Sequence, residues 1–214
     1  MSVGVPTGAY GVSFGALSVA AGLSVTQTCI LSLAMFTGGS QFAFIGVVGA
    51  GGAPVAAVAA ATLLGVRNGF YALAMAPLLR VTGWRRLAAA HLTIDESAAV
   101  ATAQLPDRDR VRDGFWATGI CVFIGWNATT FLGAVAGSTI GDPRAYGLDA
   151  AAAAAFLALL WPRLNRSLTR GVAVAAAAVA TIGVPVTPVG VPVLAAIGVA
   201  LVATAIRPDP VPDR

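Results

Sequence analysis

One arginine lies in the middle of a long apolar run. Arg67 stands about halfway along Ala53–Leu79, and an arginine at the centre of a membrane helix costs roughly 3 kcal/mol on translocon scales. Such a charge must face the interior of the protein. It could be the counter-charge of a bound carboxylate or of an internal acid, or it could link helices through their backbone carbonyls, and both interpretations are open.

A short polar stretch interrupts another apolar run. Gly38, Gly39, Ser40 and Gln41 fall in the middle of Val25–Ala50. A half-helix that ends or starts there would aim free amides at an anionic ligand. The alternative is close helix packing, with Ser40 and Gln41 bonded across an interface. Gln41 favours the ligand interpretation, because packing alone does not require its polar side chain.

Four further polar residues are candidates for chemistry or for capping. Asp95 and Glu96 follow Thr93, which could cap a short helix, and they form either a coupling-proton site or a solvated pair of charges. For Asn127, a hydrogen bond to another helix is favoured over contact with a ligand. We expect Asp149 to cap a helix N-terminus, where the helix dipole stabilises a carboxylate.

The residues needed for metal or nucleophilic catalysis are sparse. His91 is the only histidine, and Cys29 and Cys121 lie in separate apolar runs. We expect the histidine near the lipid headgroups, two free buried thiols, no metal site and no catalytic triad. The chain has no lysine, which excludes the phosphate loop of ATP-driven proteins. The sequence predicts neither a cofactor nor an enzyme.

The elements that position these residues are predicted to be membrane helices. Of 214 residues, 57% are hydrophobic and 10% are charged, whereas a soluble domain carries about 25% charged residues. The 13 basic residues are all arginine and stand singly or in pairs between apolar runs, which argues against nucleic-acid binding. The sequence predicts an all-α integral protein of the lipid bilayer.

A bilayer core about 30 Å thick requires roughly 20 apolar residues per helix. The chain holds about seven such runs, of which the fifth and sixth are short. We expect the second and third to be interrupted at the midplane, where an unwound backbone must be buried or line a watery cavity. The runs are Val3–Leu23, Val25–Ala50, Ala53–Leu79, Phe115–Ile140, Leu148–Trp161, Gly171–Val186 and Val191–Ile206.

One polar segment divides the chain. Residues 1–79 form an N-terminal membrane half with three spans, residues 80–113 a loop with an interfacial helix, and residues 114–214 a C-terminal half with four spans. The loop carries six arginines and five acids, so the positive-inside rule places it in the cytoplasm. Counting spans then puts the N-terminus outside and the C-terminus inside. Asp107–Asp113, where acids and arginines alternate, is expected to be a solvated linker.

Small residues recur along the first run. They give that helix a smooth face, which should pack closely against another helix or a second copy of the chain, so a homo-oligomer is an open alternative. Phe14–Leu17 also resembles Leu132–Val135, a weak sign of two halves inverted in the membrane. The recurring glycines are Gly4, Gly8, Gly11 and Gly15.

Together these features resemble the azaleucine-resistance, AzlC-type family of branched-chain amino-acid permeases. The resemblance implies a secondary transporter of the bacterial cytoplasmic membrane that exports leucine, isoleucine or valine. It also implies coupling to an ion gradient and a small AzlD-type membrane subunit as partner. The matching residues are Phe14-Gly15-Ala16, Phe36 to Phe42, Arg67-Asn68 with Tyr71, Asp95-Glu96 and Gly147-Leu148-Asp149.

A zwitterionic substrate needs an anion site and a cation site in an apolar pocket. Arg67 or the helix end near Ser40 could meet the carboxylate, and an internal carbonyl or acid could meet the ammonium. Asn68, Tyr71 and Asn127 complete the candidate substrate site. The rival interpretations are a structural membrane subunit, which the interrupted runs argue against, and a membrane-embedded enzyme, which lacks a nucleophile with its base.

Overall fold

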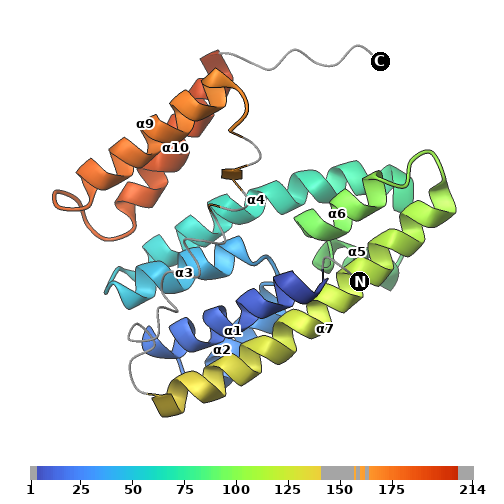
Figure 1. Cartoon of the computed structure of the whole chain (residues 1–214), viewed down its shortest axis with the longest axis horizontal. Helices are drawn as coiled ribbons and strands as arrows, with labels where there is room; N and C mark the ends of the chain where they lie inside the picture. The colour runs from blue at the N-terminus through green and yellow to red at the C-terminus, as the bar shows by residue number, and fades with distance from the viewer. Residues whose placement is uncertain (1–3, 141–156, 158–159, 162–163, 207–214) are drawn as a thin grey trace.

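The computed structural model describes residues 4–140, 157, 160–161 and 164–206. These residues form helices and turns, and no strand occurs among them. The all-α prediction is therefore confirmed for this part of the chain. The helices are α1 (Gly4–Ala20), α2 (Val25–Ala34), α3 (Gly39–Gly49), α4 (Pro54–Leu79), α5 (Trp84–His91), α6 (Asp95–Thr102), α7 (Arg108–Ile140), α9 (Ser167–Gly183) and α10 (Val191–Ile206) (Figure 1).

Two helices among the described residues are long and apolar enough to cross a membrane, namely Pro54–Leu79 and Arg108–Thr139. Helices α1, α9 and α10 are apolar but contain 17, 17 and 16 residues, fewer than the roughly 20 that a 30 Å core requires. Most of the fifth predicted run, Leu148–Trp161, lies outside the described residues. The predicted count of seven spans is therefore not confirmed.

The interruption predicted for the second run is present between α2 and α3, but the two helices form a hairpin and do not continue in one direction. The Gln41 side-chain amide donates a hydrogen bond to the Ser32 carbonyl at 3.4 Å, which links the two arms near the turn between them. The chain leaves the end of α1 at Ala21 and returns to the same place, where a Cβ on Gly49 would lie 3.0 Å from the Ala21 Cβ. Arms of 10 and 11 residues span about 15 Å each, half of a bilayer core. The hairpin enters and leaves at one end of the bundle (Figure 1).

A second hairpin enters from the opposite end. It consists of α5 and α6, which replace the single interfacial helix that we expect from the sequence. A Cβ on Gly119 of α7 would lie 3.2 Å from the Leu92 carbonyl oxygen at the tip, and one on Gly114 would lie 3.3 Å from Val100 Cγ1. Helix α6 therefore runs back along α7. The two hairpins point toward each other from the two ends of the bundle (Figure 1).

Helix α4 is continuous from Pro54 to Leu79, so the predicted interruption at Arg67–Gly69 is wrong. The polar side chains there find partners outside their own helix, Arg67 with Asp95 and Asn68 with the carbonyl of Thr93. The backbone of α4 can therefore keep its helical hydrogen bonds through the middle of the bundle.

Helices α1 and α7 run parallel and in direct backbone contact. A Cβ on Gly137 would lie 2.8 Å from the Ala16 Cα, and one on Gly15 would overlap the backbone of α7 at the Thr130 carbonyl oxygen. The close packing predicted for the first run is confirmed, with α7 as the neighbour. Because Phe14–Leu17 lies beside Leu132–Val135 in a parallel pair, the prediction that these segments mark inverted halves is wrong.

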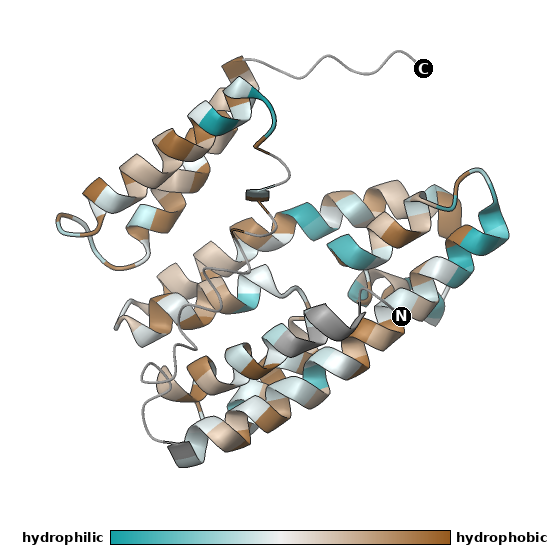
Figure 2. Cartoon of the chain, in the orientation of Figure 1, coloured by the Kyte–Doolittle hydropathy of each residue, from teal (hydrophilic) through white to brown (hydrophobic). Residues whose placement is uncertain are grey.

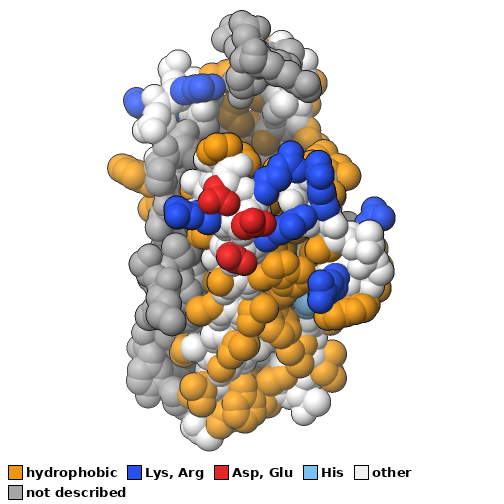
Figure 3. Space-filling view, turned by 90° about the vertical axis from the view of Figure 1, so that its right-hand side faces the viewer, with side chains coloured by type: hydrophobic (Ala, Val, Ile, Leu, Met, Phe, Trp, Pro, Cys, Tyr) orange, Lys and Arg blue, Asp and Glu red, His pale blue; other side chains and the backbone are white. Residues whose placement is uncertain are grey.

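Hydrophilic residues gather at the end of the bundle where α4 ends and α7 begins (Figure 2). Arginines are prominent among them, and this end is here called the Arg-rich end (Figure 3). The tract 107–113 is no linker, because α7 starts at Arg108 and Val111 is fully buried against Phe115 and Met75. Hydrophobic packing has extended the helix through this charged sequence. The arginines at this end are Arg80, Arg85, Arg86, Arg108, Arg110 and Arg112.

The first hairpin changes the count of membrane crossings. Since residues 25–50 return to the end they came from, only α1 and α4 separate the start of the chain from the loop after Leu79. The start of α1 therefore points toward the Arg-rich end, as its parallel partner α7 does. Within the described residues, α1 thus begins at the same end of the bundle as the main loop, whereas the sequence predicts opposite sides.

Helices α9 and α10 pack against each other at the edge of the bundle (Figure 1). Their connection lies at the opposite end from the arginines, here called the far end. A Cβ on Gly190 would lie 3.0 Å from the Ala56 Cβ, and one on Gly52 would lie 3.0 Å from Val189 Cγ1. The connection thus covers the ends of α3 and α4.

Candidate functional site

The two hairpin tips meet at a cavity of about 190 Å³ near the middle of the bundle. The tip of the first hairpin, the start of α6 in the second and one side of α1, α4 and α7 form its walls. Residues that are far apart in the sequence therefore share one site, here called the central cavity. Its lining residues are Thr7, Tyr10, Phe36, Thr37, Gly38, Gly39, Phe42, Arg67, Ile94, Asp95, Glu96, Val122 and Trp126.

The N-terminus of α3 opens on this cavity. Gly38 is the N-cap, with φ +58 and no side-chain hydrogen bond to the helix, and the first turn holds no acid. A positive φ of this kind favours glycine. The first amides of a helix lack partners within the helix and carry a partial positive charge. This end of α3 can therefore hold an anion.

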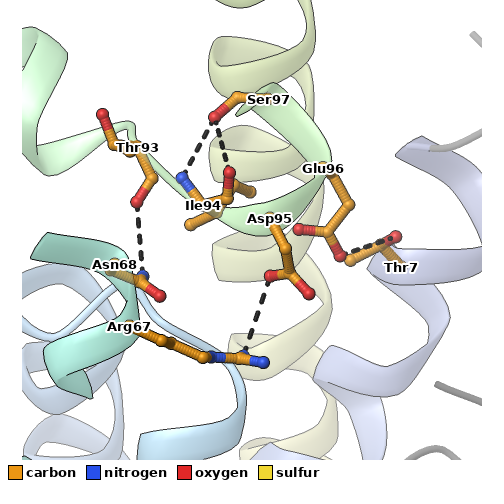
Figure 4. A network of polar contacts seen from close by, with 8 residues as sticks. All are labelled: Thr7, Arg67, Asn68, Thr93, Ile94, Asp95, Glu96 and Ser97. Carbon is orange, nitrogen blue, oxygen red and sulfur yellow. Dashed lines mark hydrogen bonds and ion pairs between the residues drawn. The ribbon is translucent and has the colours of Figure 1, made fainter. Parts of the chain in front are cut away.

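The N-terminus of α6 carries two acids, Asp95 and Glu96 (Figure 4). Asp95 Oδ1 lies 3.7 Å from Arg67 Nη2, and Glu96 Oε1 accepts a hydrogen bond from Thr7 at 3.5 Å. Two carboxylates thus share the cavity with one guanidinium. The guanidinium can pair with one of them, so the other has no basic side chain as a partner among the described residues that line the cavity.

The second tip is held by short polar contacts (Figure 4). The Asn68 amide donates to the Thr93 carbonyl at 3.2 Å. The Ser97 hydroxyl donates to the Leu92 carbonyl at 2.8 Å and accepts from the Ile94 amide at 3.0 Å. These bonds replace those that the helices cannot provide at the break, and so they fix the position of the acids.

The other wall of the cavity is aromatic and aliphatic. The ring centroids of Phe42 and Trp126 lie 6.3 Å apart in an edge-to-face arrangement. Phe14, behind them, stacks on Trp126 at 6.1 Å and meets Phe42 at 5.6 Å. Aromatic pairs in these geometries add roughly 0.5–1.5 kcal/mol each beyond burial. The cavity is therefore charged on one side and apolar on the other.

Half of the predicted site residues line the cavity. They are Gly38, Gly39, Arg67, Asp95 and Glu96. The proposed coupling acids thus share one cavity with three of the proposed substrate residues.

The remaining five candidates lie elsewhere. Ser40 and Gln41 are buried, and Gln41 ties α3 to α2 as described above, which is the packing role of the two alternatives. Asn68 supports the second tip, and Tyr71 packs against the cluster around Met75. Asn127 donates to Phe123 of its own helix at 2.8 Å, instead of to another helix as predicted.

Several lining residues escaped the sequence prediction. Phe36, Thr37 and Phe42 flank the candidate glycines, and Ile94 directly precedes Asp95, so adjacency to polar breaks is a usable signal for them. Nothing in the sequence relates Thr7 to Glu96, which form a contact only because the second hairpin brings α6 beside α1. The other residues of this group are Tyr10, Val122 and Trp126.

The histidine and the cysteines stand apart from the cavity. The His91 ring lies 5.6 Å from that of Phe123 and 6.2 Å from that of Phe36, at the end of α5. Both thiols are free, as predicted, but Cys29 is half-buried and Cys121 is exposed. Among the described residues, no group of three His, Cys, Asp or Glu side chains could hold a metal ion. The candidate cap Asp149 lies outside the described residues, as does the whole Gly147-Leu148-Asp149 motif.

Opposed hairpins around a small amphipathic cavity define a helical membrane protein with an internal solute-sized site. The chain belongs to the AzlC family, because the model described as AzlC protein matches residues 2–140. The matched region ends with α7 and therefore contains the whole central cavity. Comparison with curated proteins and with solved structures gave no match. Family membership indicates a transport-related function in a membrane.

Proposed function

We propose that this protein is a secondary transporter that exports branched-chain amino acids. The observation that carries the proposal is the central cavity, which combines an open helix N-terminus, an acidic pair and an apolar wall. These three features match the carboxylate, the ammonium and the aliphatic side chain of such a substrate. Cavities of about 150 Å³ hold benzene, so about 190 Å³ suits a small amino acid.

We assign a binding site to each charged end of the substrate from the charges of the side chains that line the central cavity. Arg67 faces Asp95 at 3.7 Å, so the guanidinium neutralises an acid of the protein. We therefore assign the substrate carboxylate to the start of α3, at Gly38 and Gly39. The ammonium is assigned to the acidic pair, where Glu96 supplies the charge that Arg67 does not compensate.

The same charge count supports coupling to an ion gradient. An uncompensated carboxylate is costly away from water, so the empty site requires a proton or another small cation at Asp95 and Glu96. The inward gradient of that cation would drive export. We propose that the Arg-rich end faces the cytoplasm of a bacterial cell, in agreement with the positive-inside rule.

A small membrane subunit of the AzlD type is proposed as the partner. Because residues of this chain form the walls of the central cavity, we propose that the substrate site lies in this chain. The rival function, a structural subunit whose partner carries the path, predicts transport by the partner alone. Reconstitution of each component separately and of both together distinguishes the two.

The test uses purified protein in liposomes, with and without the partner, and measures counterflow of radiolabelled leucine. Excess valine and isoleucine should compete, whereas leucinamide, which lacks the carboxylate, and isovalerate, which lacks the ammonium, should compete poorly. Counterflow that leucinamide inhibits as well as leucine would refute the assignment to the α3 N-terminus. Absence of leucine counterflow in all three preparations would refute the proposed substrate.

A further inference from the structure

The central cavity has a larger neighbour. A second cavity of about 710 Å³ lies toward the far end, along one side of α3 and beneath the connection between α9 and α10. Of the described residues that line the two cavities, Phe42 alone is common to both. Phe42 therefore borders both spaces.

The Phe42 ring is well placed to close the passage between them. The side chain is 8% exposed, and its ring contacts Phe14 and Trp126 at centroid distances of 5.6 and 6.3 Å. Phe14 and Trp126 come from α1 and α7, whose glycine contacts leave no space for adjustment. These two rings are the fixed side of the barrier.

Phe42 belongs to α3, and a glycine with positive φ flanks each end of this helix. Helix α3 lies between Gly38 and Gly51, with φ values of +58 and +76. Glycine tolerates changes of backbone conformation that other residues resist. A rotation of the Phe42 ring or a small shift of α3 would join the two cavities without disturbing the α1 and α7 pair.

We propose that Phe42 is the gate between the central cavity and a solute path through the second cavity to the far end. The inference rests on the proposed transport function, since a gate has meaning only if a solute crosses. The second cavity is lined by small and aliphatic residues such as Ala20, Gly46 and Val193. That lining leaves space for an aliphatic side chain and offers no charge to retain the substrate.

The gate can be tested by labelling, without reference to any substrate. In a background with Cys29→Ser and Cys121→Ser, Thr37→Cys places a reporter in the central cavity. A membrane-impermeant methanethiosulfonate reagent is added from the far end, and Ala50→Cys, in the second cavity, reports access from that side. We expect Phe42→Ala to accelerate labelling at position 37 about tenfold, because two ring contacts are lost.

Phe44→Ala is the matched control, since Phe44 belongs to the same helix and lines neither cavity among the described residues. It should leave the rate unchanged. Phe42→Trp keeps a large ring in the barrier, so position 37 should be labelled no faster in this variant than in the background. This variant keeps the proposal testable if Phe42→Ala does not fold. Equal rates in the background and in Phe42→Ala, or equal acceleration by Phe44→Ala, would overturn the proposal. The labelling result is independent of leucine counterflow, so failure of the gate and failure of the substrate assignment are distinguishable.

Discussion

Arg67 of α4 and Asp95 of α6 face each other across the central cavity, with Nη2 and Oδ1 3.7 Å apart. This pair joins the continuous helix to the second hairpin and leaves Glu96 as the unpaired charge. The cavity thus contains one basic side chain and two acidic ones, and the first two predictions below depend on this imbalance.

Removing the Arg67 guanidinium alone should lower stability more than removing both charges of the Arg67–Asp95 pair. Arg67→Ala leaves two carboxylates without a counter-charge, and we expect leucine counterflow to be abolished and stability to fall by about 1–3 kcal/mol. The double variant with Asp95→Asn should recover part of that stability. A double-mutant cycle by thermal unfolding in detergent measures the coupling, and additive effects would contradict direct interaction. Full counterflow in Arg67→Ala would contradict its role in the site.

Glu96→Gln should separate exchange from coupling. The amide removes the charge that we assign to both the substrate ammonium and the coupling cation, but it keeps an acceptor for Thr7. Leucine exchange at equal pH on both sides should therefore persist only with a weakened affinity for leucine, supported by Asp95. Accumulation driven by an imposed pH gradient should be lost. Asp109→Asn, which alters an exposed acid in the first turn of α7, is the control and should retain both activities. Gradient-driven uptake by Glu96→Gln would place the coupling elsewhere.

The two asparagines of the candidate site should behave differently. Asn68→Ala leaves the Thr93 carbonyl without its donor and loosens the second tip, which should cost about 1–3 kcal/mol and reduce leucine counterflow. Asn127→Ala removes only a bond within its own helix and should be milder in both respects. Melting temperature and counterflow are measured on the same preparations. A milder effect of Asn68→Ala would show that the tip does not depend on this bond.

Valine at position 122 is expected to limit the size of the substrate. Val122→Ala enlarges the apolar side of the cavity, so competition by phenylalanine relative to leucine should improve roughly tenfold. Val111→Ala is the control, since both valines are buried on α7 and only Val122 lines the central cavity among the described residues. The measurement is inhibition of leucine counterflow by unlabelled phenylalanine. The same change of preference in Val111→Ala would refute the assignment.

The contact between α1 and α7 should not tolerate a methyl group. Gly133→Ala places a Cβ against the backbone of Val12, and overpacking of this kind costs about 1–3 kcal/mol or more. Gly198→Ala, in α10 with open space around it, should be neutral or slightly stabilising. Size-exclusion chromatography after heating measures the difference. Equal melting temperatures would show that the helices can move apart.

The sequence predicts the helical class and the polar breaks well, because both are local properties. Composition identifies membrane helices, and Gly38 to Gln41 marks a true break. The direction that the chain takes after a break is not a local property, because it depends on contacts between distant residues. A run such as Val25–Ala50 has the same length and hydropathy whether it crosses the bilayer or turns back, and only contacts such as Gly49 with Ala21 decide between them.

In the candidate site, too, local features could be predicted from the sequence and non-local contacts could not. Arg67 and the acids could be selected as costly charges in apolar surroundings, and the structure brings them together. Their pairing could not be predicted, because it depends on the second hairpin. The hydrogen bond from Gln41 to the Ser32 carbonyl could not be predicted for a related reason, because it belongs to a hairpin that the sequence does not reveal.

The parallel pair of α1 and α7 has a consequence for biosynthesis. Helix α1 is made first, yet its glycine face finds its partner only when Gly133 has been synthesised. At roughly 5–20 residues per second, α1 must wait on the order of ten seconds in the membrane with that face uncovered. Both hairpins are made during this interval, so the cavity between them can close only when α7 arrives. A chain shortened before α7 should therefore be a substrate for membrane quality control and not a smaller transporter.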